Sequence, residues 1–74
     1  MATLLHMKLS ARNQITGTVT SVVSGEAATV VHIDAGGTKL VSSITTEAAK
    51  DLGLAEGMTV TAIIKASDVL VAVD

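Results

Sequence analysis

The chain has 74 residues, of which 49% are apolar and 16% charged, with a formal net charge of −2 and no phenylalanine, tyrosine or tryptophan. This length predicts a single domain, and the acidic balance without aromatic rings argues against single-stranded nucleic-acid binding, which uses a positive groove and stacking side chains. The absence of cysteine excludes disulfides, and no apolar run approaches the ~20 residues of a membrane-spanning helix.

The apolar content is high for so small a chain, because a short domain hides a smaller fraction of its surface than a large one. We therefore expect a homo-oligomer, which buries the excess apolar surface between subunits. Residues 2–5 are too short for a signal peptide and follow no basic residue. Together with the lack of cysteine, this predicts a cytoplasmic protein.

Two segments in the first half of the chain alternate with a period of two and are rich in β-branched residues, which predicts strands. Residues 14–23 form the first, with one face made of Ile15, Val19 and Val23. Residues 27–34 form the second, with one face made of Thr29, Val31 and Ile33. Gly36 and Gly37 tolerate positive φ and predict a hairpin turn into a third strand over residues 38–43.

Residues 46–52 change to good helix formers, and they predict one short helix with Thr45 as N-cap and Gly53 as its C-terminal stop. Residues 58–65 then predict a fourth strand and residues 69–73 a fifth. The expected fold is mainly β, a small OB-like, five-stranded and partly open barrel with one short helix.

The segment from Ser10 to Gln14 and the later run Lys65-Ala66-Ser67 are rich in hydrogen-bond donors. Arginine offers five N–H donors in a planar fork and lysine three, and neither side chain has an acceptor. Small residues after Lys65 leave the backbone N–H groups of Ala66 and Ser67 able to turn towards a ligand. These two segments predict an anion site if the fold or a neighbouring subunit brings them together.

Each cation also has an ordinary explanation. Arg12 alone would be a surface charge at the start of a strand, and Lys65 alone would protect a strand edge against association. Neither cation alone would identify an anion site; the flanking Ser10 and Asn13, together with the resemblance described next, favour it.

Ser10-Ala11-Arg12-Asn13-Gln14 together with Lys65-Ala66-Ser67 resembles the molbindin (Mop) family of small molybdate-binding proteins, over about residues 7–73. The resemblance implies a single molybdate-binding domain over residues 7–74, preceded by an extension over residues 1–6. It also implies that the strand at residues 7–9 is exchanged with a neighbouring subunit, in a hexamer built from three dimers. Where the family sometimes has serine, this chain has Ala66, so a hydroxyl contact there is lost.

Thr45 lies where a helix begins, and the N–H groups of a helix start attract anions. The segment Ser43-Ile44-Thr45 also matches a segment of related domains in which the threonine contacts the ligand. The residues expected to bind the anion are therefore Ser10, Arg12, Thr45, Lys65, Ala66 and Ser67. Those expected to support them or to serve a second site are Asn13, Ser42, Ser43 and Ile44.

His6 and His32 are far apart and have no carboxylate or third histidine at ligand spacing, so we expect no metal site. No activated nucleophile or phosphate-binding loop motif points to an enzyme. We expect a protein that binds molybdate, or the similarly shaped tungstate, for storage and homeostasis. Two alternatives are a molybdate sensor acting on a partner in trans and, less favoured, an OB-type nucleic-acid-binding module.

Overall fold

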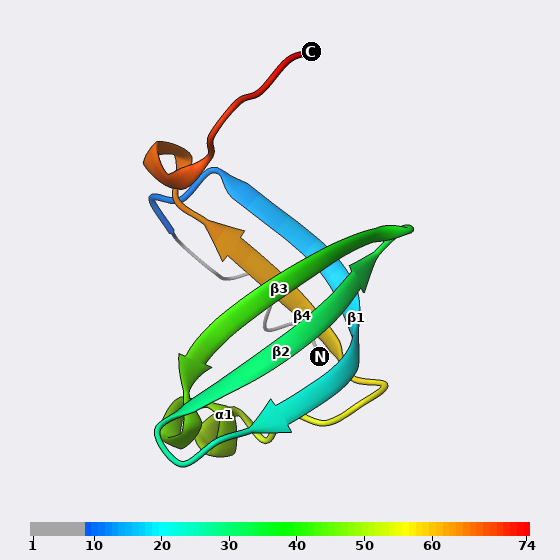
Figure 1. Ribbon diagram of the computed structural model, residues 1–74, viewed down its shortest axis with the longest axis vertical. Coiled ribbons are helices and arrows are strands. Elements are labelled where there is room, and N and C mark those ends of the chain that lie inside the picture. The colour runs from blue at the N-terminus through cyan, green and yellow to red at the C-terminus, as the bar shows by residue number, and fades with distance from the viewer. Residues whose placement is uncertain (1–8) are drawn as a thin grey trace.

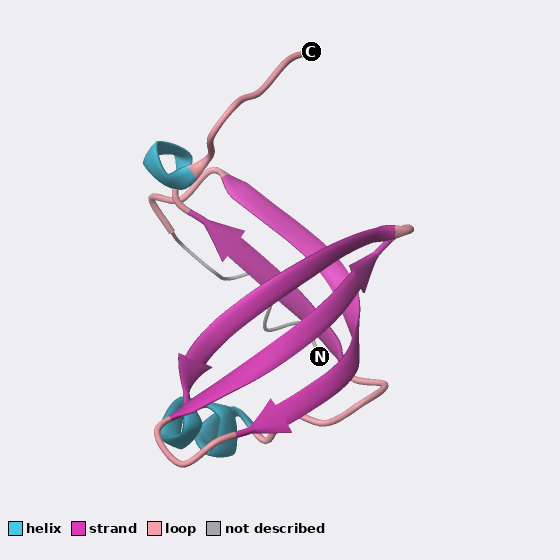
Figure 2. Ribbon diagram, in the orientation of Figure 1, coloured by secondary structure: helices cyan, strands magenta, loops and turns pink. Residues whose placement is uncertain are grey.

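Four antiparallel strands form one curved sheet in the order β3-β2-β1-β4. In the computed structural model, which describes residues 9–74, the strands are β1 (Asn13–Ser24), β2 (Ala28–Ala35), β3 (Thr38–Thr45) and β4 (Thr59–Ile64). The helix α1 (Thr46–Leu52) lies between β3 and β4, and a single 3₁₀ turn, η2 (Ala66–Asp68), follows β4 (Figure 1). Figure 2 shows that strands dominate, which confirms the expected mainly β, OB-like fold with one short helix.

The turns that connect these elements follow the chemistry of their residues. Gly36 and Gly37 have φ values of 62° and 94° in the β2–β3 hairpin, and the Gly37 N–H donates to the Asp34 carboxylate at 3.1 Å. Thr45 caps α1, because its hydroxyl accepts a hydrogen bond from Ala48 N at 3.1 Å. Gly53 ends the helix with a left-handed φ of 63°. The expected hairpin and both helix ends are therefore confirmed.

A bulge in β1 corrects one expectation about its faces. The pairing of β1 with β2 shifts between Val19 and Ser21, so that Thr20 is an extra residue. An extra residue turns every later side chain to the opposite face of the strand. Val22 consequently packs against the core, whereas Val23, expected to share a face with Val19, is 59% exposed.

Gly17 allows β1 to approach β2 closely. A Cβ atom at this position would lie 2.6 Å from Ile33 Cγ2 and 2.8 Å from the backbone oxygen of Asp34. Such distances are shorter than van der Waals contact, so no larger residue fits here without displacing β2. This close approach lies where β1 changes partners, from β4 at its beginning to β2 at its end.

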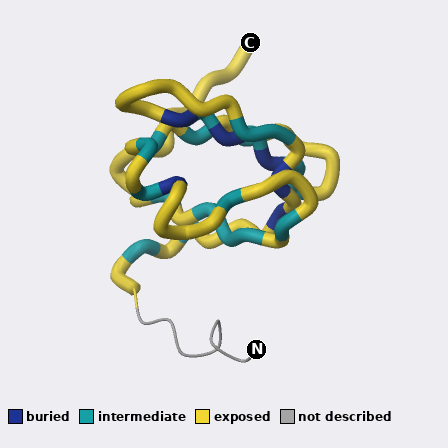
Figure 3. The backbone as a smooth tube through the Cα atoms, turned by 90° about the horizontal axis from the view of Figure 1, so that it is seen from below, coloured by how far each residue is buried: buried dark blue, intermediate teal, exposed yellow. Residues whose placement is uncertain are grey.

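The core is small. Among residues 9–74, the buried apolar side chains are Val19, Val31, Ile33 and Ala49. Thr29 is also fully buried, so the expected face of Thr29, Val31 and Ile33 is confirmed. Figure 3 shows that most of the remaining chain is exposed or half-exposed. A folded domain with so few buried apolar side chains gains little stability from its own core.

The fifth strand expected over residues 69–73 is not formed. After η2 the chain is extended but pairs with no strand of the described sheet, and Leu70, Val71 and Val73 are 91%, 88% and 92% exposed. A strand requires a neighbouring strand edge for its hydrogen bonds, and this segment runs away from the sheet (Figure 1).

The strand expected over residues 7–9 lies mostly outside the described residues, as does the extension over residues 1–6. Leu9, which is described, belongs to no strand and is 40% exposed. Within residues 9–74, no helix is long and apolar enough to cross a membrane.

Candidate anion site

The pairing of β1 with β4 brings the two donor-rich segments together at one end of the sheet. The last registered pair is Asn13 with Ile64. One step beyond this pair, Arg12 precedes β1 and Lys65 follows β4, so these two residues adjoin although they are far apart in sequence. Both are exposed, as is Ser10. The register therefore brings the backbone positions of the two cations expected to bind the anion next to each other at one end of the sheet.

Two side-chain amides hold the chain on either side of Arg12. Asn13 is half-buried, and its Nδ2 donates to the backbone oxygen of Ile64 at 3.2 Å, which ties the start of β1 to the end of β4. Gln14 Nε2 donates to the backbone oxygen of Ala11 at 3.2 Å. Asn13 was expected to support the site, and this hydrogen bond gives it a positioning role. The contribution of Gln14 was not expected, although it lies within the same motif.

The turn η2 presents backbone donors beside Lys65. Its first hydrogen bond is donated by Asp68 N to Lys65 O at 2.8 Å. The N–H groups of Ala66 and Ser67 come before that bond, so they have no acceptor within the turn. Both residues are exposed. Arg12, Lys65 and these two N–H groups thus form a cluster of donors at one end of the molecule.

Thr45 lies at the other end of the molecule. It pairs with Ala28 at the start of β2, and the next residue of β2, Thr29, pairs with Ser24 at the end of β1. Asn13, beside Arg12, is the first of the 12 residues of β1. At about 3.3 Å per residue, the path along such a strand is roughly 36 Å. Figure 1 shows α1 and η2 at opposite ends. One chain therefore does not bring Thr45 to Arg12 and Lys65.

A hydrogen-bonded network fixes the position of Thr45. The neighbouring Thr46 donates from Oγ1 to the backbone oxygen of Gly25 at 2.7 Å, and its Oγ1 lies 2.9 Å from that of the buried Thr29. The Thr46 N–H also donates to Ala27 O at 3.0 Å. These bonds attach the start of α1 to the β1–β2 turn. Thr29 and Thr46 were not expected to have this role, and no local sequence pattern identifies it.

The remaining residues of the expected supporting set lie on both faces of β3. Ser42 and Ile44 are half-buried, and both line a groove between β3 and β4. Ser43 is exposed and shares the opposite face of the strand with Thr45, because alternate residues of a strand point the same way. Ser42 and Ser43 therefore face opposite sides of β3.

The two histidines of the chain were considered as metal ligands, and no metal site was expected. His32 is half-buried in β2, while His6 lies outside the described residues. Between residues 9 and 74, no group of three or more histidine, cysteine, aspartate or glutamate side chains could hold a metal ion. The donor cluster has the chemistry of an oxyanion site, since Arg12 and Lys65 offer only N–H donors and positive charge.

Comparison with known proteins agrees with this chemistry. Residues 9–71 match the TOBE domain family. The chain is 46% identical over 69 residues to a probable molybdenum-pterin-binding protein of Haemophilus influenzae, covering 92% of this chain and 100% of the relative.

Two solved structures are similar in fold. A molybdate-binding protein of Sporomusa ovata is 39% identical with a TM-score of 0.86, covering 89% of this chain and 98% of the other. ModG, a cytoplasmic molybdate-binding protein solved with molybdate bound, is 42% identical with a TM-score of 0.84, covering 89% of this chain and 48% of ModG. The chain therefore belongs to the TOBE domain family, as a protein of the molbindin type.

Proposed function

We propose that this protein binds molybdate and serves to store and buffer the oxyanion. The observation that carries the proposal is the donor cluster at the end of β1 and β4, where Arg12 adjoins Lys65 beside the N–H groups of η2. Relatives named for molybdenum-pterin or molybdate binding support this choice of ligand. The role is reversible binding without covalent chemistry, and the protein is not an enzyme.

The proposed site lies between subunits. Arg12, Lys65 and the hydroxyl of Ser10 come from one chain with the N–H groups of Ala66 and Ser67, and Thr45 comes from a neighbouring chain. Two cations balance the charge of the dianion, which lowers the cost of removing it from water at an interface. The separation of Thr45 from Arg12 within one chain supports a shared site, because no single chain holds all these donors near one point.

We further propose that the protein is a cytoplasmic homo-oligomer, a hexamer built from three dimers, and that it also accepts tungstate. The small core supports association, since the surface that one chain leaves exposed requires a partner for burial. Tungstate has the same charge and nearly the same shape as molybdate. We therefore expect the donor cluster to distinguish both from smaller oxyanions better than from each other.

Thermal unfolding with different oxyanions tests the proposed function. A ligand bound only by the folded assembly stabilises it by about 2.7 kcal/mol at a hundredfold excess over Kd. For a domain of this length, that is expected to raise Tm by roughly 10–20 °C. Molybdate and tungstate should produce this increase, and sulfate and phosphate at equal concentration should produce much less. Identical unfolding curves with and without molybdate would exclude the proposed ligand.

A further inference from the structure

A series of hydrogen bonds ties the start of α1 to the β1–β2 turn. Thr46 Oγ1 donates to the backbone oxygen of Gly25 at 2.7 Å and lies 2.9 Å from Thr29 Oγ1. A hydroxyl group has a single proton, and Thr46 uses its proton on Gly25. The bond between the two threonines is therefore donated by Thr29. We call Thr29 and Thr46, joined in this direction to the Gly25 oxygen, the threonine clamp.

The acceptor of the threonine clamp is held in place by its own turn. The Gly25 N–H donates to the backbone oxygen of Ala28 at 2.9 Å, and a Cβ atom at Gly25 would lie 2.7 Å from that oxygen. A larger residue would therefore displace the turn. The Thr46 N–H donates to the backbone oxygen of Ala27 at 3.0 Å, so the turn holds Thr46 through both its backbone and its side chain. At the other end of the clamp, Thr29 is 0% exposed, which anchors it in the core.

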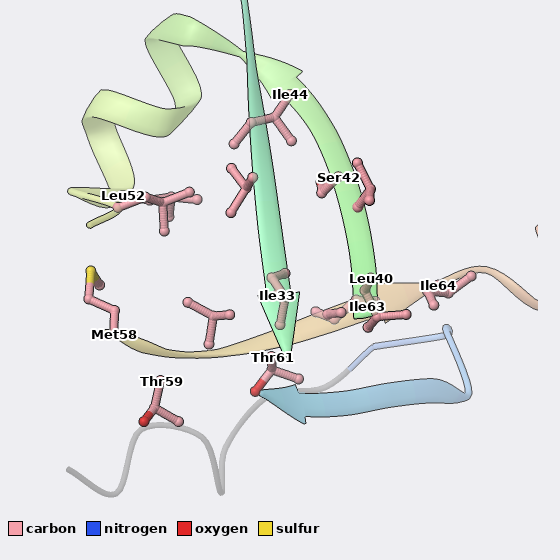
Figure 4. Close-up of a pocket in the computed structure, with 15 residues that line it drawn as sticks. Ile33, Leu40, Ser42, Ile44, Leu52, Met58, Thr59, Thr61, Ile63 and Ile64 are labelled. Atoms are coloured by element: carbon pink, nitrogen blue, oxygen red, sulfur yellow. The ribbon is translucent and has the colours of Figure 1, made fainter. Parts of the chain in front are cut away.

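Thr45 lies between this clamp and a second anchor. Ile44, the residue before it, packs against the core and lines the groove between β3 and β4 (Figure 4). The hydroxyl of the exposed Thr45 accepts a hydrogen bond from Ala48 N at 3.1 Å, which leaves its own proton able to be donated to a ligand. The backbone on both sides of Thr45 and the direction of its hydroxyl are thus fixed by contacts within the protein.

A donor held this firmly can select an anion by size. Sites that discriminate between ligands hold their donors within about 0.5 Å, through supporting hydrogen bonds and packing. Sulfate and molybdate are both tetrahedral dianions, and sulfate is the smaller. If Thr45 of one chain faces Arg12 and Lys65 of another, an anion must be large enough to contact both sides. A displaced Thr45 would lose this discrimination.

We propose that Thr46 is a positioning residue which, through the threonine clamp, sets the selectivity of the site for molybdate over sulfate. This inference rests on the proposed function, because it requires that Thr45 of a neighbouring chain contacts the anion. Neither Thr46 nor Thr29 contacts the anion itself, and both act only through the position of Thr45.

Removal of both hydroxyl groups of the clamp tests the proposal. In Thr29→Val/Thr46→Val no buried hydroxyl is left without a partner, and replacing both members of a hydrogen bond by apolar groups of the same shape is nearly neutral for stability. Calorimetric titration with molybdate, followed by its displacement with sulfate, gives both affinities. The double variant should bind molybdate roughly tenfold more weakly, as when supporting partners are lost in metal sites, and sulfate less than about threefold more weakly. The ratio of the two affinities therefore falls.

Two single substitutions separate positioning from folding. Thr46→Ser keeps the donor oxygen and should retain the selectivity of the unchanged chain. Thr38→Val removes a hydroxyl from an exposed residue at the other end of β3, and it should change both affinities by less than about twofold. A purely structural role of the clamp would reduce the binding-competent fraction of the protein. Both anions would then bind more weakly by the same factor, and the ratio of their affinities would stay unchanged.

The outcome distinguishes this inference from the proposed function. Thr29→Val, which retains the bonds of Thr46 to the turn, provides a second measurement and should lower the ratio in the same direction. If the unchanged chain binds molybdate and both the double variant and Thr29→Val keep its ratio of affinities, the inference fails and the proposed function stands. If the unchanged chain does not bind molybdate, the proposed function fails and the inference fails with it.

Discussion

Thr45→Asp is expected to weaken molybdate binding about a thousandfold while the protein remains folded. Aspartate caps helices as well as threonine does, so the hydrogen bond from Ala48 N is retained. A carboxylate offers no donor to an oxyanion and repels it, and like charges about 4 Å apart repel by ~4 kcal/mol at an effective dielectric constant near 20. Isothermal titration calorimetry with molybdate measures the change.

Ala55→Asp is the matched control for Thr45→Asp. Ala55 is exposed in the turn after α1, so the substitution adds the same charge near the same end of the molecule. Its molybdate affinity is expected to change by less than about threefold, since exposed charges beyond contact distance are screened by salt. Equal affinities of Thr45→Asp and Ala55→Asp would remove Thr45 from the site.

Arg12→Lys is expected to weaken molybdate binding by about 1.5–3 kcal/mol and to leave the assembly intact, because the substitution keeps the charge and loses the planar fork. A guanidinium donates two parallel hydrogen bonds to one oxyanion, and an ammonium group cannot reproduce that geometry. Calorimetric titration of the unchanged chain and of Arg12→Lys with molybdate, in one buffer, measures the difference in affinity. Unchanged affinity would mean that Arg12 acts only as a surface charge.

Lys65→Ala removes a positive charge and leaves the planar guanidinium of Arg12 in place. It is expected to weaken molybdate binding and to make the remaining affinity less sensitive to salt. Lys39→Ala provides the control, because Lys39 is an exposed cation of β3 at the β2–β3 hairpin. A salt dependence that falls equally in both variants would show a general charge effect with no specific contact at Lys65.

The elements predicted correctly from the sequence are those decided by local chemistry. The alternation of Thr29, Val31 and Ile33 along β2 is uninterrupted, so the sequence predicts correctly that these three side chains share the buried face. The left-handed glycines and the cap at Thr45 are likewise properties of a few adjacent residues.

The errors arose where distant contacts decide the outcome. Val23 was assigned to the wrong face because the bulge at Thr20 forms where β1 changes partners, and there Val19 exchanges backbone hydrogen bonds with Gly57 and Met58. Nothing near Thr20 in the sequence indicates that event. Residues 69–73 have strong β propensity, but propensity supplies no partner strand for their hydrogen bonds.

In the candidate site too, some features follow from local sequence and others depend on distant contacts. The donor character of Arg12 and Lys65 is a property of their side chains, and the sequence motif indicated it. Their juxtaposition depends on the register of β1 with β4, and the distance to Thr45 depends on the order of all four strands. The sequence therefore predicts which residues carry the chemistry, and the topology shows that one chain does not bring Thr45 to Arg12 and Lys65.

The most direct test of a site shared between subunits is complementation of two inactive chains. Arg12→Ala and Thr45→Asp chains are unfolded together, refolded as a mixture of equal parts, and measured for bound molybdate by equilibrium dialysis. If Arg12 of one chain and Thr45 of a neighbour form each site, random assembly restores about a quarter of the sites, although neither variant binds alone. Absence of binding in the mixture, with both variants present in the same oligomers, would contradict the shared site.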